Sequence, residues 1–187
     1  MRLLLALARS KLSGQPLMPK DIWPVQALIC WGLDTALYKD KLLHYWGQMP
    51  YQFYACTEAG ILALQSWRKQ GMTFTPFPAF LEFIPEQELY SANRNHKQPS
   101  TVLLDQLEPG QRYELVITSF HGMPFLRYRV GHIVKVLSRE EKETGIQLPQ
   151  IAFEARADGL IDLAGFTRMD ENTIERAIEM SGIRGDG

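Results

Sequence analysis

The sequence predicts a mixed α/β protein built from three consecutive segments. Near the N-terminus, short apolar runs alternate with helical patterns, which is typical of parallel strands joined by a helix. Further along, apolar residues recur with a period of two between turns, which indicates antiparallel strands. We therefore expect an α/β segment at 1–72, a mainly antiparallel sheet or small barrel at 73–155, and a closing segment at 156–187.

The first segment is expected to contain two helices and two strands. Leucines at helical spacing predict a helix that ends near Gly14. The apolar run 25–31, bounded by proline and glycine, predicts a buried strand, and apolar residues at helical intervals predict a helix over 35–45. A second strand begins at 51–56. Strand, helix and strand in this order imply a parallel pair with a right-handed crossover.

The second segment is expected to contain four strands, and a helix closes the chain. Alternating apolar residues predict strands at 79–84, 113–119, 125–137 and 151–155. The polar stretch 91–100 is predicted to be a loop. Asp170 is a suitable N-cap for the last helix, which carries Ile174, Ala177 and Ile178 on one face.

Composition limits the classes of function. A chain of 187 residues with 45% apolar and 22% charged residues is ordinary for a globular protein. Its 20 basic and 21 acidic residues nearly balance, so the sequence lacks the excess of positive charge that is typical of proteins that bind nucleic acid or an anionic membrane. Cys30 and Cys56 have no metal-ligand spacing around them, so we expect both to be reduced. Arg9 and Lys11 interrupt the N-terminal apolar run, which favours a helix and not a signal peptide. With the balanced charge, this leads us to expect a cytoplasmic protein that acts on small molecules.

A first group of chemically useful residues follows the predicted strand 51–56. The pentapeptide Tyr54-Ala-Cys-Thr-Glu58 brings an aromatic ring, a hydroxyl and a carboxylate to the strand end, where α/β sheets bind ligands. An aromatic ring can stack on adenine, a threonine hydroxyl can donate to a phosphate oxygen, and a glutamate can hold magnesium. The alternative is a strand end followed by a helix cap, with Thr57 and Glu58 solvated.

A second group follows at Leu126-Arg-Tyr-Arg-Val-Gly-His132, and a third at Arg156-Ala-Asp158. Two arginines around a tyrosine are costly to bury, so the alternative for these segments is an exposed strand with cation and aromatic packing. The joint order of the three groups is more specific than any one of them.

The ordered set resembles the motifs of the adenylate-forming enzyme superfamily, which includes acyl-CoA synthetases and luciferases. Tyr54-Ala-Cys-Thr-Glu58 resembles its Y-G-x-[ST]-E motif, and Arg127-Tyr-Arg-Val-Gly-His132 resembles its Y-R-T-G-D motif. Arg156-Ala-Asp158, with Gly165, resembles the hinge motif that joins its two domains. Four segments resemble the branch of auxin-responsive acyl acid amido synthetases: Ile22-Trp-Pro24, Phe80-Leu-Glu-Phe-Ile-Pro85, Tyr113-Glu-Leu-Val-Ile-Thr118 and Arg127-Tyr-Arg-Val-Gly131.

The resemblance implies a C-terminal portion of an adenylate-forming large domain, followed by the hinge and the first helix of the small domain. It implies that a carboxylic acid attacks the α-phosphate of ATP, releasing pyrophosphate, and that an amine such as an amino acid, or a thiol, then takes the acyl group. By motif position, Tyr54 would stack on adenine, Thr57 would bind phosphate, Glu58 would hold Mg²⁺ and Arg156 would reach the ribose. Thr57 and Glu58 would be the catalytic residues, and Asp158 would be the hinge residue.

The sequence departs from the family pattern at three points. His132 stands where the family has a ribose-binding aspartate, and losing one charged hydrogen bond there costs roughly 1.5 to 3 kcal/mol. His132 is also open to a purely structural role. The sequence contains no Ser/Thr/Gly-rich phosphate loop followed by lysine, and it ends one predicted helix after the hinge.

These departures leave three hypotheses and two expectations. The chain is a portion of an acyl-adenylate-forming ligase, or a non-catalytic remnant acting as a binding or interaction module, or one half of a composite ligase completed by another polypeptide. We expect weak ATP binding by the isolated chain. We also expect an exposed apolar surface and self-association, because few helices are available to cover the apolar strands.

Overall fold

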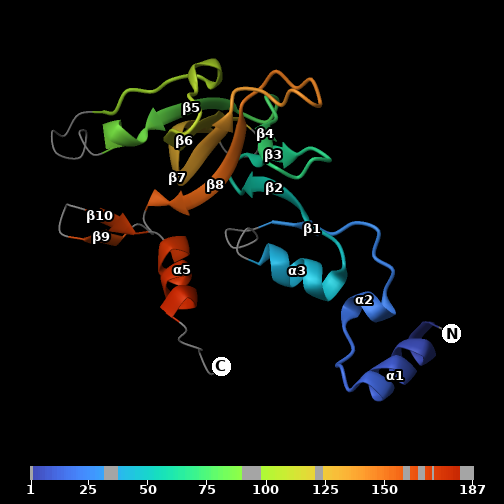
Figure 1. The fold of residues 1–187 in the computed structure, drawn as a ribbon. Coiled ribbons are helices and arrows are strands. Elements are labelled where there is room, and N and C mark those ends of the chain that lie inside the picture. Colours follow the sequence, from blue (N-terminus) through green and yellow to red (C-terminus); the bar gives the residue numbers. More distant parts are fainter. Residues whose placement is uncertain are drawn as a thin grey trace. The chain divides into compact units, whose positions relative to one another are not determined.

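The fold is known from a computed structural model that describes residues 2–31, 38–89, 98–120, 124–157, 161–163, 167–169 and 171–181 (Figure 1). The chain divides into two compact units, Met1–Phe53 and Tyr54–Gly187. The second unit thus groups the Tyr54 motif with the antiparallel strands. None of the described helices is long and apolar enough to span a membrane.

The first unit contains three helices and one parallel strand pair among its described residues. Its elements are α1 (Arg2–Ser13), α2 (Pro19–Ile22), β1 (Ile29–Cys30), α3 (Lys39–Trp46) and the start of β2 (Tyr51–Cys56). The backbone N–H of Gly14, at φ 69°, donates to the carbonyl of Ser10 and ends α1 where the sequence predicts. Ile29 of β1 lies beside Tyr51 of β2 in a parallel pair, which confirms the predicted parallel pairing.

Two boundaries in the first unit differ from the prediction. The strand expected at 25–31 is reduced to Ile29–Cys30. A turn precedes it, in which the N–H of Val25 donates to the carbonyl of Trp23. The helix expected at 35–45 is described only from Lys39, since 32–37 lie outside the described residues.

The second unit consists mainly of strands. Its elements after β2 are β3 (Gly60–Gln65), β4 (Met72–Phe74), β5 (Phe80–Pro85), the short 3₁₀ helix η2 (Leu104–Gln106), β6 (Arg112–Ser119), β7 (Phe125–Ser138), β8 (Gln150–Arg156), β9 (Ile161–Leu163), β10 (Thr167–Met169) and α5 (Glu171–Ser181). The main sheet has the order β1-β2-β3-β4-β8-β7-β6-β5, and β9 pairs with β10. Five neighbouring pairs of this sheet are antiparallel: β3–β4, β4–β8, β8–β7, β7–β6 and β6–β5. The chain therefore has a mixed α/β fold with one partly parallel, open sheet, and the alternative of a closed small barrel is wrong.

The predicted strands at 79–84, 113–119, 125–137 and 151–155 are confirmed as β5 to β8, each within about a residue or two at its ends. The closing helix is confirmed as α5, although its expected cap Asp170 lies outside the described residues. Strands β3 and β4 were not predicted. The apolar run 61–64 of β3 is too short to separate a strand from a helix by periodicity.

The larger core of the second unit lies on one face of this sheet, and a smaller cluster around Val116 and Ile133 lies on the other. Leu62, Phe83, Leu115 and Val134 are fully buried in the larger core, although they come from four different strands. Gly71 is buried between Leu137 and Gln150, and an added Cβ would lie 3.0 Å from a Leu137 methyl group. Strand pairing and side-chain packing therefore hold β3, β5, β6 and β7 together.

Candidate functional site

Tyr54 and His132 lie in contact although 78 residues separate them in the sequence. The hydroxyl oxygen of Tyr54 is 2.7 Å from Nδ1 of His132, and the two ring centroids are 5.6 Å apart. The ring of Phe153 completes the cluster, 5.9 Å from Tyr54 and 5.4 Å from His132. Three strands separate β2 from β7 in the sheet order, so the sheet must curve to bring these rings together.

Arg156 lies beside His132. The two residues are direct partners in the antiparallel pair of β7 and β8. Gly131 precedes His132 at φ 72°, and the pairing register shifts immediately after His132, between Ile133 and Val134. A left-handed glycine with a register shift is typical of a β-bulge, a feature that re-aims neighbouring side chains.

Thr57 and Glu58 lie in the turn that follows β2. Thr57 is exposed and Glu58 is half-buried. Burial raises the pKa of the Cys56 thiol to about 11, and the nearby Glu58 carboxylate adds to this rise. Burial also raises the pKa of Tyr54 well above its ordinary value, with smaller contributions from Cys56 and Glu58. Tyr54 and Cys56 therefore stay protonated near neutral pH.

The structure thus brings five of the predicted positions into one neighbourhood. Tyr54 contacts His132, His132 pairs with Arg156, and Glu58 is close enough to influence Tyr54 electrostatically. Thr57 precedes Glu58 in the same turn. This turn leads into β3 rather than a helix, so the helix-cap alternative is wrong. The expected hinge residue Asp158 lies outside the described residues.

The Tyr54 side chain is 6% exposed. Its ring is therefore largely covered by neighbouring groups, among them His132 and Phe153. The predicted stacking of Tyr54 on adenine remains a prediction, and it requires an exposed part of this ring.

Arg129 forms an ion pair with the buried Glu114 that the sequence analysis missed. Its guanidinium donates to both carboxylate oxygens of Glu114, with an Nε to Oε1 distance of 2.9 Å. Glu114 is 2% exposed, so its charge depends on this bidentate partner. The sequence did hold a signal for this pair. A glutamate within the apolar strand 113–119 is expected to be buried, and a buried carboxylate needs a cationic partner.

Arg127 is held in a similar way at a strained backbone position. Its φ is 45°, in the left-handed region that is uncommon for arginine. Its Nε donates to Glu82 Oε2 at 3.1 Å, Nη2 donates to Thr101 Oγ1 at 3.2 Å, and its backbone N–H donates to Thr118 Oγ1 at 3.0 Å. Both arginines thus bond buried carboxylates while they are themselves exposed, at 57% for Arg127 and 46% for Arg129, so 126–129 is an exposed stretch of strand as the alternative expects.

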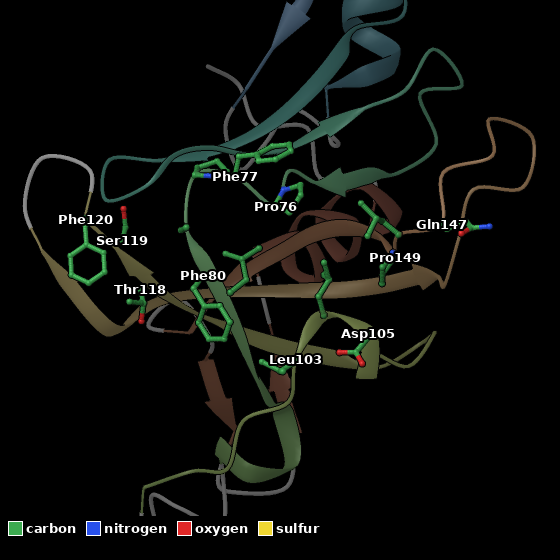
Figure 2. A pocket seen from close by; sticks show the side chains of 15 residues that line it. Pro76, Phe77, Phe80, Leu103, Asp105, Thr118, Ser119, Phe120, Gln147 and Pro149 are labelled. Atoms are coloured by element: carbon green, nitrogen blue, oxygen red, sulfur yellow. The ribbon is translucent and has the colours of Figure 1, made fainter.

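A separate pocket of about 620 Å³ lies on the second unit (Figure 2). It is lined by parts of β5 and β6 and by residues 76–79, 103–105 and 147–149. Figure 2 shows Phe77, Phe80, Leu103 and Phe120 around it. Asp105 is the one charged residue of its lining, and the lining shares no residue with the Tyr54 neighbourhood.

Comparison with known proteins shows which family this architecture represents. Residues 72–156 match the family model of the GH3 family central domain. The chain contains a GH3 central domain. This domain runs from β4 to β8 and includes His132 and Arg156, whereas Tyr54, Thr57 and Glu58 precede it.

Curated relatives that this chain matches are amido synthetases. The indole-3-acetic acid-amido synthetase GH3.4 of Arabidopsis thaliana is 31% identical over 150 residues, which are 77% of this chain and 24% of the relative. The jasmonoyl–L-amino acid synthetase GH3.5 of Oryza sativa subsp. japonica is 28% identical over 172 residues, covering 81% of this chain and 27% of the relative. The chain therefore spans about a quarter of the length of these relatives.

Solved structures with a similar fold are adenylate-forming ligases. The GH3.15 acyl acid amido synthetase matches with a TM-score of 0.59 and 22% identity, covering 87% of this chain and 27% of that one. A 2-hydroxyisobutyryl-CoA ligase in complex with 2-HIB-AMP matches with a TM-score of 0.65 and 16% identity, covering 94% and 35%. These findings confirm the family resemblance inferred from the motifs.

Proposed function

We propose that this chain forms part of the nucleotide site of an acyl-adenylate-forming ligase. The parent activity would activate a carboxylic acid with ATP and transfer the acyl group to an amine such as an amino acid. The contact between Tyr54 and His132 carries this proposal. It brings together two motifs that are 78 residues apart and that follow one another along the sequence in the order expected for such an enzyme. The pairing of His132 with Arg156 and the GH3 relatives support it.

The nucleotide would be bound by four residues of this neighbourhood. Tyr54 would contact adenine, Arg156 and His132 would contact the ribose, and Thr57 would donate to a phosphate oxygen. Arg156 and Thr57 are both exposed, as groups that meet a ligand must be. Little covalent chemistry is asked of these side chains, because positioning and charge neutralisation supply most of the catalysis in such reactions.

Glu58 would hold Mg²⁺ together with the nucleotide. Its carboxylate suits the ion, and Mg²⁺ is usually bound by one or two carboxylates, by phosphate oxygens and by water. Across the described ranges there is no group of three or more His, Cys, Asp or Glu side chains suited to a metal. This fits an ion bound largely through the nucleotide's phosphates. When bound, Mg²⁺ would neutralise phosphate charge.

The remaining parts of the reaction would come from residues outside this chain. This chain matches only 24% of the length of the first relative, so a phosphate loop and a catalytic lysine would be supplied by a longer polypeptide or by a complementary one. We propose an amine acceptor because the curated relatives are amido synthetases, with a thiol acceptor as the alternative that the CoA ligase neighbour suggests. We place the reaction in the cytoplasm.

A second candidate is a non-catalytic binding or interaction module. The burial of Tyr54 favours it, because a 6% exposed ring whose hydroxyl is bonded to His132 offers little surface to adenine. In that case the Tyr54 cluster would be part of the core, and His132 would have a structural role.

ATP titration of the chain by NMR separates the two candidates, since it detects millimolar affinities. We expect weak, saturable shifts that Arg156→Ala reduces. The matched control is Arg139→Ala, because Arg139 is an exposed arginine that pairs with Glu108 away from this neighbourhood. Equal binding by the Arg156 and Arg139 variants would contradict the nucleotide site.

The substitution His132→Asp tests the ribose position directly. It should strengthen ATP binding by up to about 3 kcal/mol, because a carboxylate accepts from both ribose hydroxyls. No gain in affinity would favour the structural role of His132. Pyrophosphate release, measured for the chain alone and with the polypeptide encoded next to it, then tests for a composite ligase, which would be active only in the mixture.

A further inference from the structure

The pocket beside β5 and β6 is built from rigid segments of the second unit (Figure 2). Phe80 and Thr118 are direct partners in the antiparallel pair of these two strands. Pro76, Pro78 and Pro149 line the pocket as well, and a proline ring fixes its own φ angle. The cavity volume of about 620 Å³ lies within the range of pockets that hold small molecules. The pocket is therefore preformed and large enough for a small organic ligand.

Three aromatic rings of the lining are open to solvent. Phe77 is 94% exposed, Phe120 is 75% exposed and Phe80 is 58% exposed. Figure 2 shows the three rings around the same pocket, together with Leu103. Exposed apolar side chains that gather at one hollow are typical of a ligand-binding groove, because covering them removes apolar surface from water. We therefore expect the occupant to have an apolar body.

Asp105 is the one charged residue among the described lining residues. It lies in η2, whose entry is fixed by a hydrogen bond of 2.8 Å from the backbone N–H of Leu103 to Gln106 Oε1. The Asp105 side chain is exposed, and within the described ranges it has no hydrogen bond or ion pair. Its carboxylate can therefore pair with a cation of the occupant. A carboxylate of the occupant would find no arginine, lysine or histidine among the described lining residues.

We propose that this pocket binds a small molecule that joins an apolar body to a protonated amine and lacks a carboxylate. The phenylalanine rings would cover the apolar body, and a cation also lies favourably over the face of an aromatic ring. The Asp105 carboxylate would pair with the ammonium group. Carboxylic acids and free amino acids are disfavoured, since they would place a like charge beside Asp105. The pocket shares no residue with the Tyr54 neighbourhood, so this inference does not rest on the proposed function.

NMR titration of the full ¹⁵N-labelled chain at pH 7 with three probes tests the proposal. The probes share a phenyl ring and differ in their polar group: 2-phenylethylamine is a cation, 2-phenylethanol is neutral and 3-phenylpropionate is an anion. We expect saturable shifts of the backbone amides of Phe77, 103–105 and 118–120. The amine should bind most tightly and the carboxylate most weakly. No saturable shift of these amides with the amine, or tightest binding of the carboxylate, would overturn the proposal.

Asp105→Asn removes the charge and keeps the size of the side chain. It should weaken binding of the amine by about two- to fivefold, as expected for an exposed ion pair, and leave binding of the alcohol unchanged. Asp40→Asn is the matched control, because Asp40 is an exposed aspartate of α3 in the first unit, and it should change neither affinity. An amine affinity that the two substitutions affect equally would contradict the role of Asp105.

Phe77→Ala removes the most exposed of the three rings. It should weaken binding of all three probes, because they share the apolar body, and unchanged affinities would rule out an apolar site here. If either pocket variant does not fold, the ranking of the three probes on the wild-type chain decides. Shifts of the same amides on raising the protein concentration without a probe would assign the pocket to a second copy of the chain and overturn the small-molecule site.

Discussion

The two compact units of this chain differ sharply in how they treat their apolar residues. In the second unit, Leu62, Phe83, Leu115 and Val134 are completely buried. In α1 of the first unit, the leucines range from 39% to 89% exposed, and Ala6 is the one buried residue of that helix. Paired strands thus supply a core within the second unit, whereas α1 presents its apolar side chains to solvent. We infer that the second unit contributes most of the stability of the chain.

The largest expected effect comes from removing a core aromatic ring. Phe83 packs edge-on against Phe74 and Tyr113 and is fully buried. Phe83→Ala should lower the free energy of unfolding by about 3 to 5 kcal/mol. Leu4→Ala, at a 71% exposed leucine of α1, should change it by less than about 0.5 kcal/mol.

Urea unfolding followed by circular dichroism measures both variants. Similar losses for the core and the α1 substitution would break the comparison, because they would mean that α1 is as tightly packed in solution as β5.

A smaller effect is expected from breaking the ion pair between the half-exposed Arg129 and the buried Glu114. Arg129→Ala would leave the Glu114 carboxylate buried without its cation, and we expect a loss of at least about 2 kcal/mol, allowing for the half-exposed arginine. Arg139→Ala is the control, since the pair of Arg139 with Glu108 is exposed on both sides and should contribute less than about 1 kcal/mol. Equal thermal unfolding curves for the two variants would show that Glu114 reaches water in solution.

The strands of the second unit could be predicted because their periodicity is local. The strand predicted at 113–119 is confirmed as β6, but its burial does not alternate, because all residues from Tyr113 to Ile117 are buried. Val116 is buried as well, because β6 lies inside the sheet and both of its faces are covered. Strands β3 and β4 escaped prediction because the apolar run of β3 is short and β4 has only three residues, so their pairing within the sheet is what identifies them as strands.

The candidate site could be predicted only through the order of its motifs. Nothing local to Tyr54 or His132 indicates that they touch, since their contact requires the curvature of a sheet with three strands between them. The partners of Arg127 and Arg129 could not be identified either. A glutamate in an apolar run signals that a cation is needed, but the pairing register across β5, β6 and β7 decides which one.

The exposed leucines of the first unit lead to the prediction of self-association. Leu4 is 71% exposed and Leu12 is 89% exposed. The double substitution Leu4→Lys, Leu12→Lys should weaken association by about tenfold or more, because burying each leucine contributes about 1 to 2 kcal/mol. Light scattering over a concentration series measures this effect. A clean monomer of the wild-type chain at high concentration would remove the support for an exposed interface.

The smallest expected effect concerns a buried carboxylate at the edge of the second unit. Glu141 is 6% exposed and accepts hydrogen bonds from the hydroxyls of Ser66 and Thr144, both at 2.7 Å. The Ser66 hydrogen bond is the main reason that the pKa of Glu141 lies below its ordinary value. A depressed pKa in the folded state stabilises the protein above the ordinary glutamate pKa, and this stabilisation is lost as the pH falls through the folded value.

Ser66→Ala should therefore destabilise the chain by about 1 kcal/mol at pH 7, and by less in acid, where Glu141 is protonated in both proteins. Ser13→Ala is the matched control, because the Ser13 hydroxyl accepts only an exposed backbone hydrogen bond, from Gln15 at the end of α1. Thermal unfolding of both variants at pH 7 and near pH 3 gives the comparison. A Ser66→Ala difference that is the same at both pH values would show that the hydroxyl acts on packing and not on the charge of Glu141. A pH-dependent loss of stability that occurs only for Ser66→Ala would show that the Glu141 charge stabilises the second unit, which also contains the core that Phe83→Ala disrupts.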